Sequence, residues 1–369
     1  MKKIRFTRLI LLFLMIILAQ GCSSIFVVGE KESAGIIDAD NPNIQYVGRF
    51  DFTDPKKVGY DWPGIYICAK FEGTSCAIRL SDYSNEYAIT IDNMRPKLLK
   101  KDSSEVRQVA SGLDSTVPHT IKIQKRTESF VGKGEFLGFI LDDGKKLLPP
   151  DSRPERRIEF IGNSITSGYG VEGEDSTCHF SPETENACMS YASITARELK
   201  ADYSLISYSG RGVVRNYGDV NKTSPDPMPY LYDRICFNDS ISKWDFSTWI
   251  PQAVVINLGT NDFSTEPYPD KSVFQKAYLK LINRVRALYP GVTIFCVCGP
   301  MIEEPCLGYI KEVIEGEQKN TRDKDIFFIV IQRSMMTGED WGCDFHPNIK
   351  GMNKISKLLA EEIQLRMNW

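Results

Sequence analysis

An apolar, strand-like run gives way to a polar turn at Phe160-Ile161-Gly162-Asn163-Ser164-Ile165-Thr166, and this stretch opens the second half of the chain. Similar strand-like runs recur to the end of the sequence. They are Arg157–Ile161, Tyr203–Tyr208, Ala253–Leu258, Thr293–Val297 and Ile326–Ile331. Helix-like runs alternate with them, at Ser190–Leu199, Lys271–Leu288 and Ile349–Met367. The alternation predicts an α/β domain over residues 155–369, with helices on both faces of a parallel sheet in three layers.

The preceding hundred residues have a different pattern. Between Tyr46 and Leu148 the sequence consists of short alternating runs punctuated by Gly, Asp and Asn, which predict an antiparallel β-sandwich or jelly roll over residues 45–150. The runs are Ile65–Phe71, Cys76–Leu80, Tyr87–Ile91, His119–Gln124 and Phe136–Leu141. Pro149, Pro150 and Pro154 mark a stiff boundary before the second domain. Two domains also suit a length of 369 residues.

The N-terminus predicts export. Four basic residues precede Leu9–Leu18, an apolar run that is too short to span a bilayer but suits a signal peptide. Leu18-Ala19-Gln20-Gly21-Cys22 resembles a bacterial lipobox, although Gln20 is unusual there. We therefore expect residues 1–21 to be a signal peptide, Cys22 a lipid anchor and residues 22–44 a tether at the cell envelope. Alternatively, Ala19-Gln20-Gly21 is a cleavage site that releases a soluble secreted protein.

Composition excludes several classes of function. A formal net charge of -3, with no basic cluster interleaved with aromatic residues, argues against a nucleic-acid partner. The chain has ten cysteines and only three histidines, and none of them has zinc-like spacing, so we expect no metal and no cofactor. Cys178 and Cys188 flank a polar stretch and could close a loop by a disulfide. Cys296 and Cys298 lie two apart in a strand-like run and are predicted to be small core residues.

Four loops carry candidate chemistry, because ligands bind beyond the carboxyl ends of the strands in such folds. Ser164 lies at a strand-to-helix turn, where its hydroxyl can be a nucleophile, although a Gly-x-Ser turn alone is more typical of a helix cap. Gly210 can expose a backbone N–H, and the Asn261 amide could donate to an oxyanion or simply cap a turn. His346, just before the last helix-like run, is the candidate general base.

Together these loops resemble the SGNH (GDSL-like) hydrolases over about residues 156–369. The four blocks appear in order as Gly162-Asn163-Ser164-Ile165-Thr166, Gly210, Gly259-Thr260-Asn261-Asp262 and His346-Pro347. Longer stretches are similar to carbohydrate esterase family two, whose acetyl esterases carry a jelly roll ahead of the SGNH domain. These stretches are Phe160–Gly170, Arg215–Tyr217, Trp249–Phe263 and Asp344–Asn348.

Two positions depart from the family pattern. Asn163 stands where the first block usually has Asp, which leaves the local hydrogen bonding of this position open. Cys343 stands three residues before His346, where the family usually has Asp, and a neutral thiol is a weak acceptor. Asp344 is therefore a tentative third catalytic residue. The alternative is a Ser-His dyad whose imidazole is oriented by a backbone carbonyl, as the resemblance to family two implies, and we favour it.

The resemblance implies a serine acetyl esterase that acts on acetylated xylan or glucomannan. Ser164 would attack, His346 would serve as base, and the backbone N–H groups of Ser164 and Gly210 with the Asn261 amide would form the oxyanion hole. Trp341 and Tyr169 are candidates for stacking on sugar rings, or else for ordinary packing. Two alternatives stay open. One is a lipase or thioesterase on the same fold, and the other is a non-catalytic glycan-binding lipoprotein.

Overall fold

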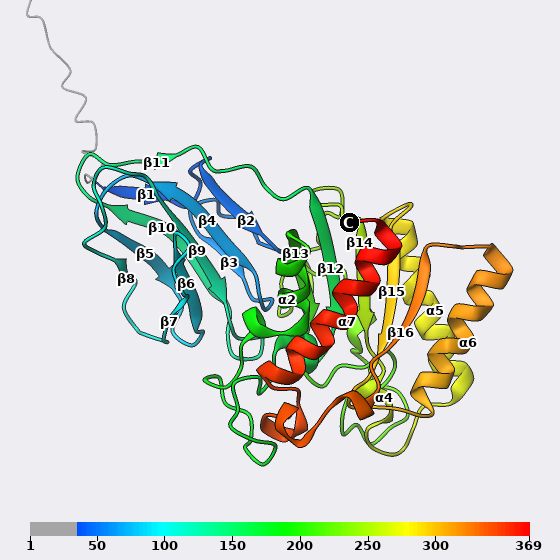
Figure 1. The fold of residues 1–369 in the computed structure, drawn as a ribbon. Coiled ribbons are helices and arrows are strands. Elements are labelled where there is room, and N and C mark those ends of the chain that lie inside the picture. Colours follow the sequence, from blue (N-terminus) through cyan, green and yellow to red (C-terminus); the bar gives the residue numbers. More distant parts are fainter. Residues whose placement is uncertain (1–34) are drawn as a thin grey trace, which may run out of the picture. The chain divides into compact units, whose positions relative to one another are not determined.

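The computed structural model describes residues 35–369, so the predicted signal peptide and Cys22 lie outside the described residues (Figure 1). The first domain is a sandwich of two antiparallel sheets. One sheet has the order β1 (Ile36–Asp38), β10 (Gly134–Leu141), β5 (Cys76–Ser81), β8 (Val106–Ala110), with β3 (Val58–Tyr60) paired to β10. The other has the order β11 (Leu147–Leu148), β4 (Tyr66–Phe71), β9 (His119–Lys125), β6 (Tyr87–Ile91), β7 (Lys97–Leu99), with β2 (Ile44–Val47) paired to β4.

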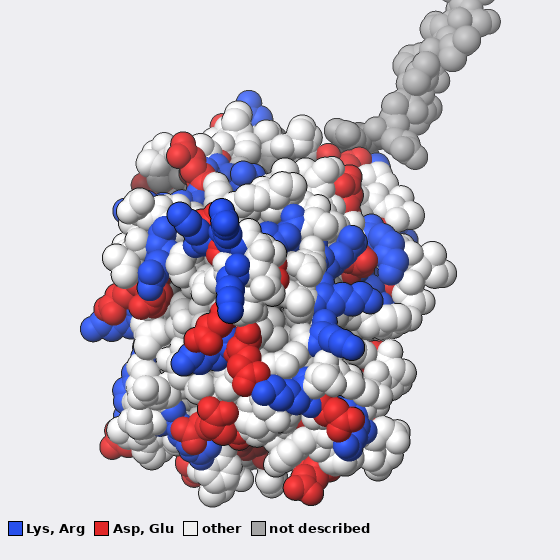
Figure 2. Space-filling model, turned by 90° about the vertical axis from the view of Figure 1, so that its right-hand side faces the viewer, with Lys and Arg blue, Asp and Glu red and all other residues white. Residues whose placement is uncertain are grey.

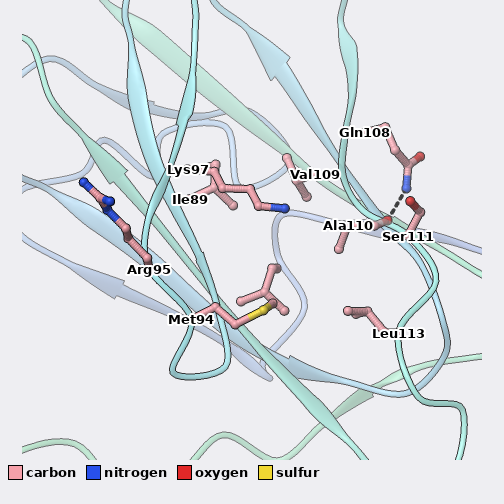
Figure 3. Close-up of a pocket in the computed structure, with 10 residues that line it drawn as sticks. Ile89, Met94, Arg95, Lys97, Gln108, Val109, Ala110, Ser111 and Leu113 are labelled. Atoms are coloured by element: carbon pink, nitrogen blue, oxygen red, sulfur yellow. Dashed lines mark hydrogen bonds between the residues drawn. The ribbon is translucent and has the colours of Figure 1, made fainter.

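The sandwich is held together by side chains that alternate inward from both sheets. Phe71, Ile78, Ile123, Phe136 and Phe139 are all buried in one continuous cluster. The predicted β-sandwich is therefore confirmed. It begins earlier than residue 45, because β1 pairs with β10, so the end of the predicted tether at residues 22–44 belongs to the sandwich. A cavity of about 480 Å³ opens at the edge formed by β6, β7 and β8, where apolar side chains line it together with Arg95, Lys97, Gln108 and Ser111 (Figure 3).

The second domain contains a five-stranded, all-parallel sheet, as the alternation predicted. Its order is β13 (Ala201–Ser207), β12 (Arg156–Gly162), β14 (Ala253–Asn257), β15 (Thr293–Cys298), β16 (Ile326–Val330). Helices α2 (Tyr191–Glu198) and α7 (Ile349–Met367) cover one face, and α5 (Lys271–Leu288) and α6 (Cys306–Thr321) cover the other. Shorter helical segments are α1 (Ser164–Ser167), η1 (Ala187–Met189), α3 (Met228–Leu231), α4 (Thr260–Phe263), η2 (Arg333–Met335), η3 (Gly338–Asp340) and η4 (Cys343–Phe345).

Residues along one central strand divide between the two faces of this sheet, as its pleat requires. Ala253 and Val255 belong to the hydrophobic cluster under α2 and α7, whereas Val254 and Ile256 belong to the cluster under α5 and α6. Cys296 joins the second cluster and is fully buried, as is Cys298, so their predicted role as core residues is confirmed.

The two domains share buried polar contacts. Tyr66 donates to the Asp202 carboxylate at 2.7 Å, and the Trp62 indole N–H donates to the Ile235 carbonyl at 2.7 Å. Buried Arg49 reaches the Glu159 carboxylate at 3.4 Å. Because unpaired polar groups are costly to bury, these contacts fix one domain against the other.

Basic and acidic side chains are interspersed on the side of the molecule that carries α5 and α6, and neither sign dominates that face (Figure 2). Within residues 35–369, no helix combines the length and apolar character that crossing a membrane would require. In the same residues, no group of three or more His, Cys, Asp and Glu side chains is placed to hold a metal ion.

Candidate active site

Ser164 and His346 meet at the carboxyl end of the sheet. β12 ends at Gly162, and Ser164 is the first residue of α1. The turn is tight, because a Cβ at Gly162 would lie 2.0 Å from the Thr166 hydroxyl oxygen. The side chain of Asn163 caps α1 by accepting from Ile165 N at 3.3 Å, so Asn serves here as an ordinary N-cap. Ser164 Oγ then lies 2.8 Å from His346 Nε2, which is hydrogen-bond distance for a nucleophile and its base.

Backbone carbonyls orient the imidazole. His346 Nδ1 lies 3.3 Å from the carbonyl oxygen of Cys343 and 3.2 Å from that of Asp344. When Nδ1 carries the proton, its N–H group donates to these carbonyls, and Nε2 is then free to accept the serine proton. Burial lowers the pKa of His346 to about 4, and the two carbonyls only partly oppose this shift. The imidazole is therefore neutral near pH 7, as a general base must be.

The carboxylate of Asp344 is turned away from the imidazole. It accepts hydrogen bonds from the Tyr169 hydroxyl at 2.7 Å, from His179 Nδ1 at 2.8 Å and from Phe180 N at 3.1 Å. Asp344 adopts a left-handed conformation with φ +51°, so the chain bends here and sends the side chain toward residues 169–180. The tentative assignment of this carboxylate as third member of a triad is therefore corrected: only its backbone oxygen faces His346.

The cysteine pairing also differs from the expectation. Cys178 forms a disulfide with Cys343, 165 residues away, and Cys188 is a buried free thiol. The segment around Cys178 lies along the loop that carries His346, because Asp344 N donates to the Cys178 carbonyl at 2.8 Å. Sequence proximity suggested Cys188 as the partner, whereas the fold brings the distant Cys343 to Cys178. Position 343 thus offers a disulfide sulfur and no thiol.

The candidate oxyanion donors flank Ser164. The strand order β13-β12-β14 places the loop with Gly210 on one side of Ser164 and α4, which carries Asn261, on the other. Gly210 has φ +78°, a conformation that favours glycine. Asn261 donates one Nδ2 hydrogen to the Arg211 carbonyl at 2.9 Å, which ties the two loops together and leaves a second hydrogen for a ligand.

Asp262 is a site residue whose role the sequence did not reveal. Its buried carboxylate accepts from three consecutive backbone N–H groups in the Gly210 loop, those of Val213 at 2.8 Å, Val214 at 2.8 Å and Arg215 at 3.0 Å. Burial raises the pKa of Asp262 to about 6, and these three hydrogen bonds oppose the shift. Its place beside Asn261 in the third block was the one available signal.

Aromatic rings surround the dyad. The Tyr169 ring lies 4.2 Å from the His346 ring, and Phe180 and Phe130 extend the contact at 4.9 Å each. Phe345, next to His346, is 57% exposed, and Tyr217, whose N–H donates to the Gly210 carbonyl, is 63% exposed. The sequence singled out Tyr169 but missed the others, since an isolated loop aromatic has no periodic signal. Trp341, the second candidate, is half-buried and packs under the Arg333 guanidinium at 5.4 Å.

The fold and the site define a serine hydrolase of the SGNH type. Comparison with known proteins agrees: residues 46–150 match the family described as "Carbohydrate esterase 2 N-terminal", and residues 160–354 match the "GDSL-like Lipase/Acylhydrolase family". The chain belongs to carbohydrate esterase family two, within the GDSL-like hydrolases.

Several relatives are similar over most of the chain. A Cellvibrio japonicus "Acetylxylan esterase / glucomannan deacetylase" is 35% identical and covers 84% of this chain and 86% of its own. "Cellulase/esterase CelE" of Acetivibrio thermocellus is 39% identical over 90% of this chain, and this chain spans 40% of the length of that protein. A family two carbohydrate esterase from Clostridium thermocellum, solved in complex with cellohexaose, superposes with a TM-score of 0.81 at 38% identity, covering 88% of this chain and 99% of that one.

Proposed function

We propose that this protein is a serine acetyl esterase that removes O-acetyl groups from polysaccharides or oligosaccharides of the xylan or glucomannan type. The observation that carries the proposal is the 2.8 Å contact between Ser164 Oγ and Nε2 of a neutral, half-buried His346. The names of the relatives from Cellvibrio japonicus support the substrate class.

The geometry suits acyl transfer in two steps. Ser164 Oγ attacks the acetyl carbon as its proton passes to His346 Nε2. The backbone N–H groups of Ser164 and Gly210 and the Asn261 amide hold the resulting oxyanion. His346 then protonates the sugar oxygen, the ester C–O bond breaks and the sugar leaves. A water molecule that gives its proton to His346 attacks the acetyl-serine. The bond between the acetyl carbon and Ser164 Oγ then breaks, His346 returns the proton to Oγ, and acetate leaves.

Exposed aromatic rings around the dyad support a carbohydrate substrate, because sugar rings present C–H faces that pack on aromatic faces. Tyr169, which lies against His346, and the exposed Phe345 and Tyr217 are the candidates that the structure favours. Trp341 stays a weaker candidate, since the Arg333 guanidinium covers one face of its ring.

The decisive test is acetate release from acetylated xylan and acetylated glucomannan, with p-nitrophenyl acetate as a small reference ester. We expect Ser164→Ala and His346→Ala to lower kcat by roughly a thousandfold or more without unfolding the chain. Ser103→Ala, at an exposed serine of the β-domain, is the matched control and should behave as wild type. Near-normal turnover by a folded Ser164→Ala chain would rule out the mechanism.

The same assay separates the alternatives. A lipase or thioesterase would prefer butyryl and longer acyl esters, or acyl thioesters, over acetyl esters. A non-catalytic glycan-binding protein would bind the polysaccharide and release no acetate. Preference for the acetyl ester, together with acetate release from a glycan, is the result that we expect.

We further propose that Cys22 carries a lipid that holds the protein at the bacterial cell envelope, with a soluble secreted form as the alternative. The basic start, the apolar run Leu9–Leu18 and Gly21-Cys22 support this. Full-length protein produced in a bacterium should incorporate labelled fatty acid and partition with membranes, and Cys22→Ser should abolish both. A soluble wild-type protein in which Cys22 is unmodified, or has been removed by cleavage, would favour simple secretion.

A further inference from the structure

A buried acidic side chain from the β-domain reaches the loop that carries Gly210. Glu128 follows β9 and is fully buried. One of its carboxylate oxygens accepts from Ser209 N at 2.6 Å, and the other accepts from the Ser209 hydroxyl. Ser209 immediately precedes Gly210, so this contact lies one peptide bond from a proposed oxyanion donor.

The segment that presents Glu128 is itself fixed within the β-domain. Lys125 is fully buried, and its ammonium group donates to the carbonyl oxygens of Asp61, Thr127 and Glu128. The Ser129 hydroxyl also donates to the Asp61 carbonyl at 3.1 Å. A carboxylate on so constrained a segment can hold a neighbouring loop in place, because its own position does not depend on that loop.

A second buried acid lies beside Glu128. Glu185 accepts from Glu128 N at 3.1 Å. Burial, and then the charge of Glu128, raise the pKa of Glu185 well above its ordinary value. Burial also raises the pKa of Glu128, but the hydrogen bonds with Glu185 and Ser209, and then the charge of Lys125, oppose that shift. We therefore assign the proton of the pair to Glu185 and the negative charge to Glu128.

On the C-terminal side of Gly210, side chains of the catalytic domain hold the loop. Asn261 binds the Arg211 carbonyl, and Asp262 binds the N–H groups of residues 213–215. On the N-terminal side of Gly210, the Glu128 carboxylate accepts hydrogen bonds from both the N–H group and the hydroxyl of Ser209. The Gly210 N–H belongs to the peptide that joins Ser209 to Gly210, so its direction depends on how Ser209 is held.

We propose that Glu128 is a positioning residue for the oxyanion hole, acting through Ser209, so that the β-domain completes the active site of the catalytic domain. The inference rests on the proposed esterase function and adds that full activity requires Glu128 from the β-domain. Loss of Glu128 leaves the nucleophile and base intact but frees the Ser209–Gly210 peptide to turn, and this weakens stabilisation of the oxyanion more than binding of the ester.

The test compares variants at Glu128 and Ser209, with p-nitrophenyl acetate as substrate because this small ester needs no distant subsite. We expect Glu128→Ala to lower kcat about a hundredfold, the scale of one oxyanion donor, and Glu128→Gln to lower it about tenfold, since Gln retains one acceptor. KM should stay within about twofold in both. Ser209→Ala, which loses the hydroxyl contact only, should lose about threefold.

Phenylboronic acid provides an independent measurement, because its tetrahedral adduct on Ser164 places an oxygen in the oxyanion hole. Its inhibition constant should rise in proportion to the loss in kcat for each variant. Glu183→Gln, at an exposed acid paired with Lys101, is the control and should stay within about twofold of wild type.

Two results would overturn the inference. One is a folded Glu128→Gln or Glu128→Ala chain whose kcat and inhibition constant stay within twofold of wild type. The other is a change in KM alone. If Glu128→Ala does not fold, the Gln and Ser209→Ala variants decide. Failure of the proposed function is a separate outcome, since the wild-type protein itself would then hydrolyse no ester.

Discussion

The two sides of the catalytic serine are held by different kinds of groups. On the His346 side, neutral backbone carbonyls at 3.2 and 3.3 Å orient the imidazole. On the oxyanion side, two buried carboxylates hold the loop around Gly210, Glu128 from the β-domain and Asp262 from the catalytic domain. The negative charge that a catalytic triad places behind the histidine is used here to fix backbone N–H groups.

This difference has consequences for both sides. Without a carboxylate behind it, the imidazolium of His346 is poorly stabilised in its partly desolvated site, so the base is weak and stays unprotonated in mild acid. On the other side, charge-assisted hydrogen bonds are shorter and stronger than neutral ones, which suits groups that must keep N–H donors aimed at one point. We therefore expect larger losses from changes on the oxyanion side than from changes behind the histidine.

The largest effect in this comparison should come from Asn261→Ala. Removing the amide deletes one oxyanion donor and also the bond to the Arg211 carbonyl, so we expect kcat to fall about a hundredfold or more, with little change in KM. Asn353→Ala, at an exposed amide on α7, is the matched control. A change in KM alone would show that Asn261 positions the substrate and does not stabilise the transition state.

The pH dependence of kcat/KM tests the protonation of His346. Only neutral His346 can accept the Ser164 proton, so activity is lost as pH falls through the pKa of the imidazole. Because that pKa is lowered to about 4, protonation of His346 alone should leave roughly nine-tenths of kcat/KM at pH 5 and then lower it about tenfold per pH unit well below pH 4. Asp262, whose pKa is raised to about 6, adds a separate loss below that pH if its protonation loosens the Gly210 loop, and Asp262→Asn removes this second titration. An imidazole of ordinary pKa near 6.5 would already lose about thirtyfold at pH 5.

The same shift affects stability. The folded chain keeps His346 neutral, whereas the unfolded chain takes up a proton below about pH 6.5. The contribution of this group to stability is therefore present above that pH and is lost as pH falls toward 4. An acid limb near pH 6.5 that persists in Asp262→Asn would contradict the weak base and would indicate a solvated imidazole or a carboxylate behind it.

Local patterns in the sequence were sufficient for much of the fold. The predicted helices at 271–288 and 349–367 match α5 and α7, because each has a continuous apolar stripe and clear ends. Helix α6 was missed. Its Gly308 and Gly316 lower helix propensity, and packing of Ile310 and Ile314 against the sheet compensates.

The candidate site was predictable only where its residues lie in blocks. Ser164, Asn261 and His346 each follow or precede a regular element, and the parallel sheet gathers such loops at one edge. Glu128 lies in the other domain, and the Cys178–Cys343 disulfide joins segments 165 residues apart, so neither has a local signal. The direction of the Asp344 side chain depends on a left-handed backbone conformation that no pattern in the sequence predicts.

The smallest expected effect concerns Asp344, where a triad and a dyad make opposite predictions. In a triad, neutralising the carboxylate behind the histidine costs as much as about 10⁴ in rate. Here that carboxylate binds Tyr169, His179 and Phe180, and burial is outweighed by these hydrogen bonds, which keep its pKa below the ordinary value. Asn has nearly the same shape and tolerates φ +51°. It therefore keeps the backbone carbonyl of residue 344 in place for His346.

We accordingly expect Asp344→Asn to lower kcat by less than about tenfold. It should also be less stable, because the Asn amide has a single oxygen and loses one or two of the three hydrogen bonds that the carboxylate accepts. Asp344→Ala is the matched comparison: it removes every side-chain contact and tolerates the left-handed bend less well, so it should be less stable and less active than the Asn variant. The measurement is kcat for p-nitrophenyl acetate beside Tm for each variant. A thousandfold loss in a folded Asp344→Asn chain would show that the carboxylate reaches His346 during turnover, and the contrast between a neutral base side and a charged oxyanion side would then fail.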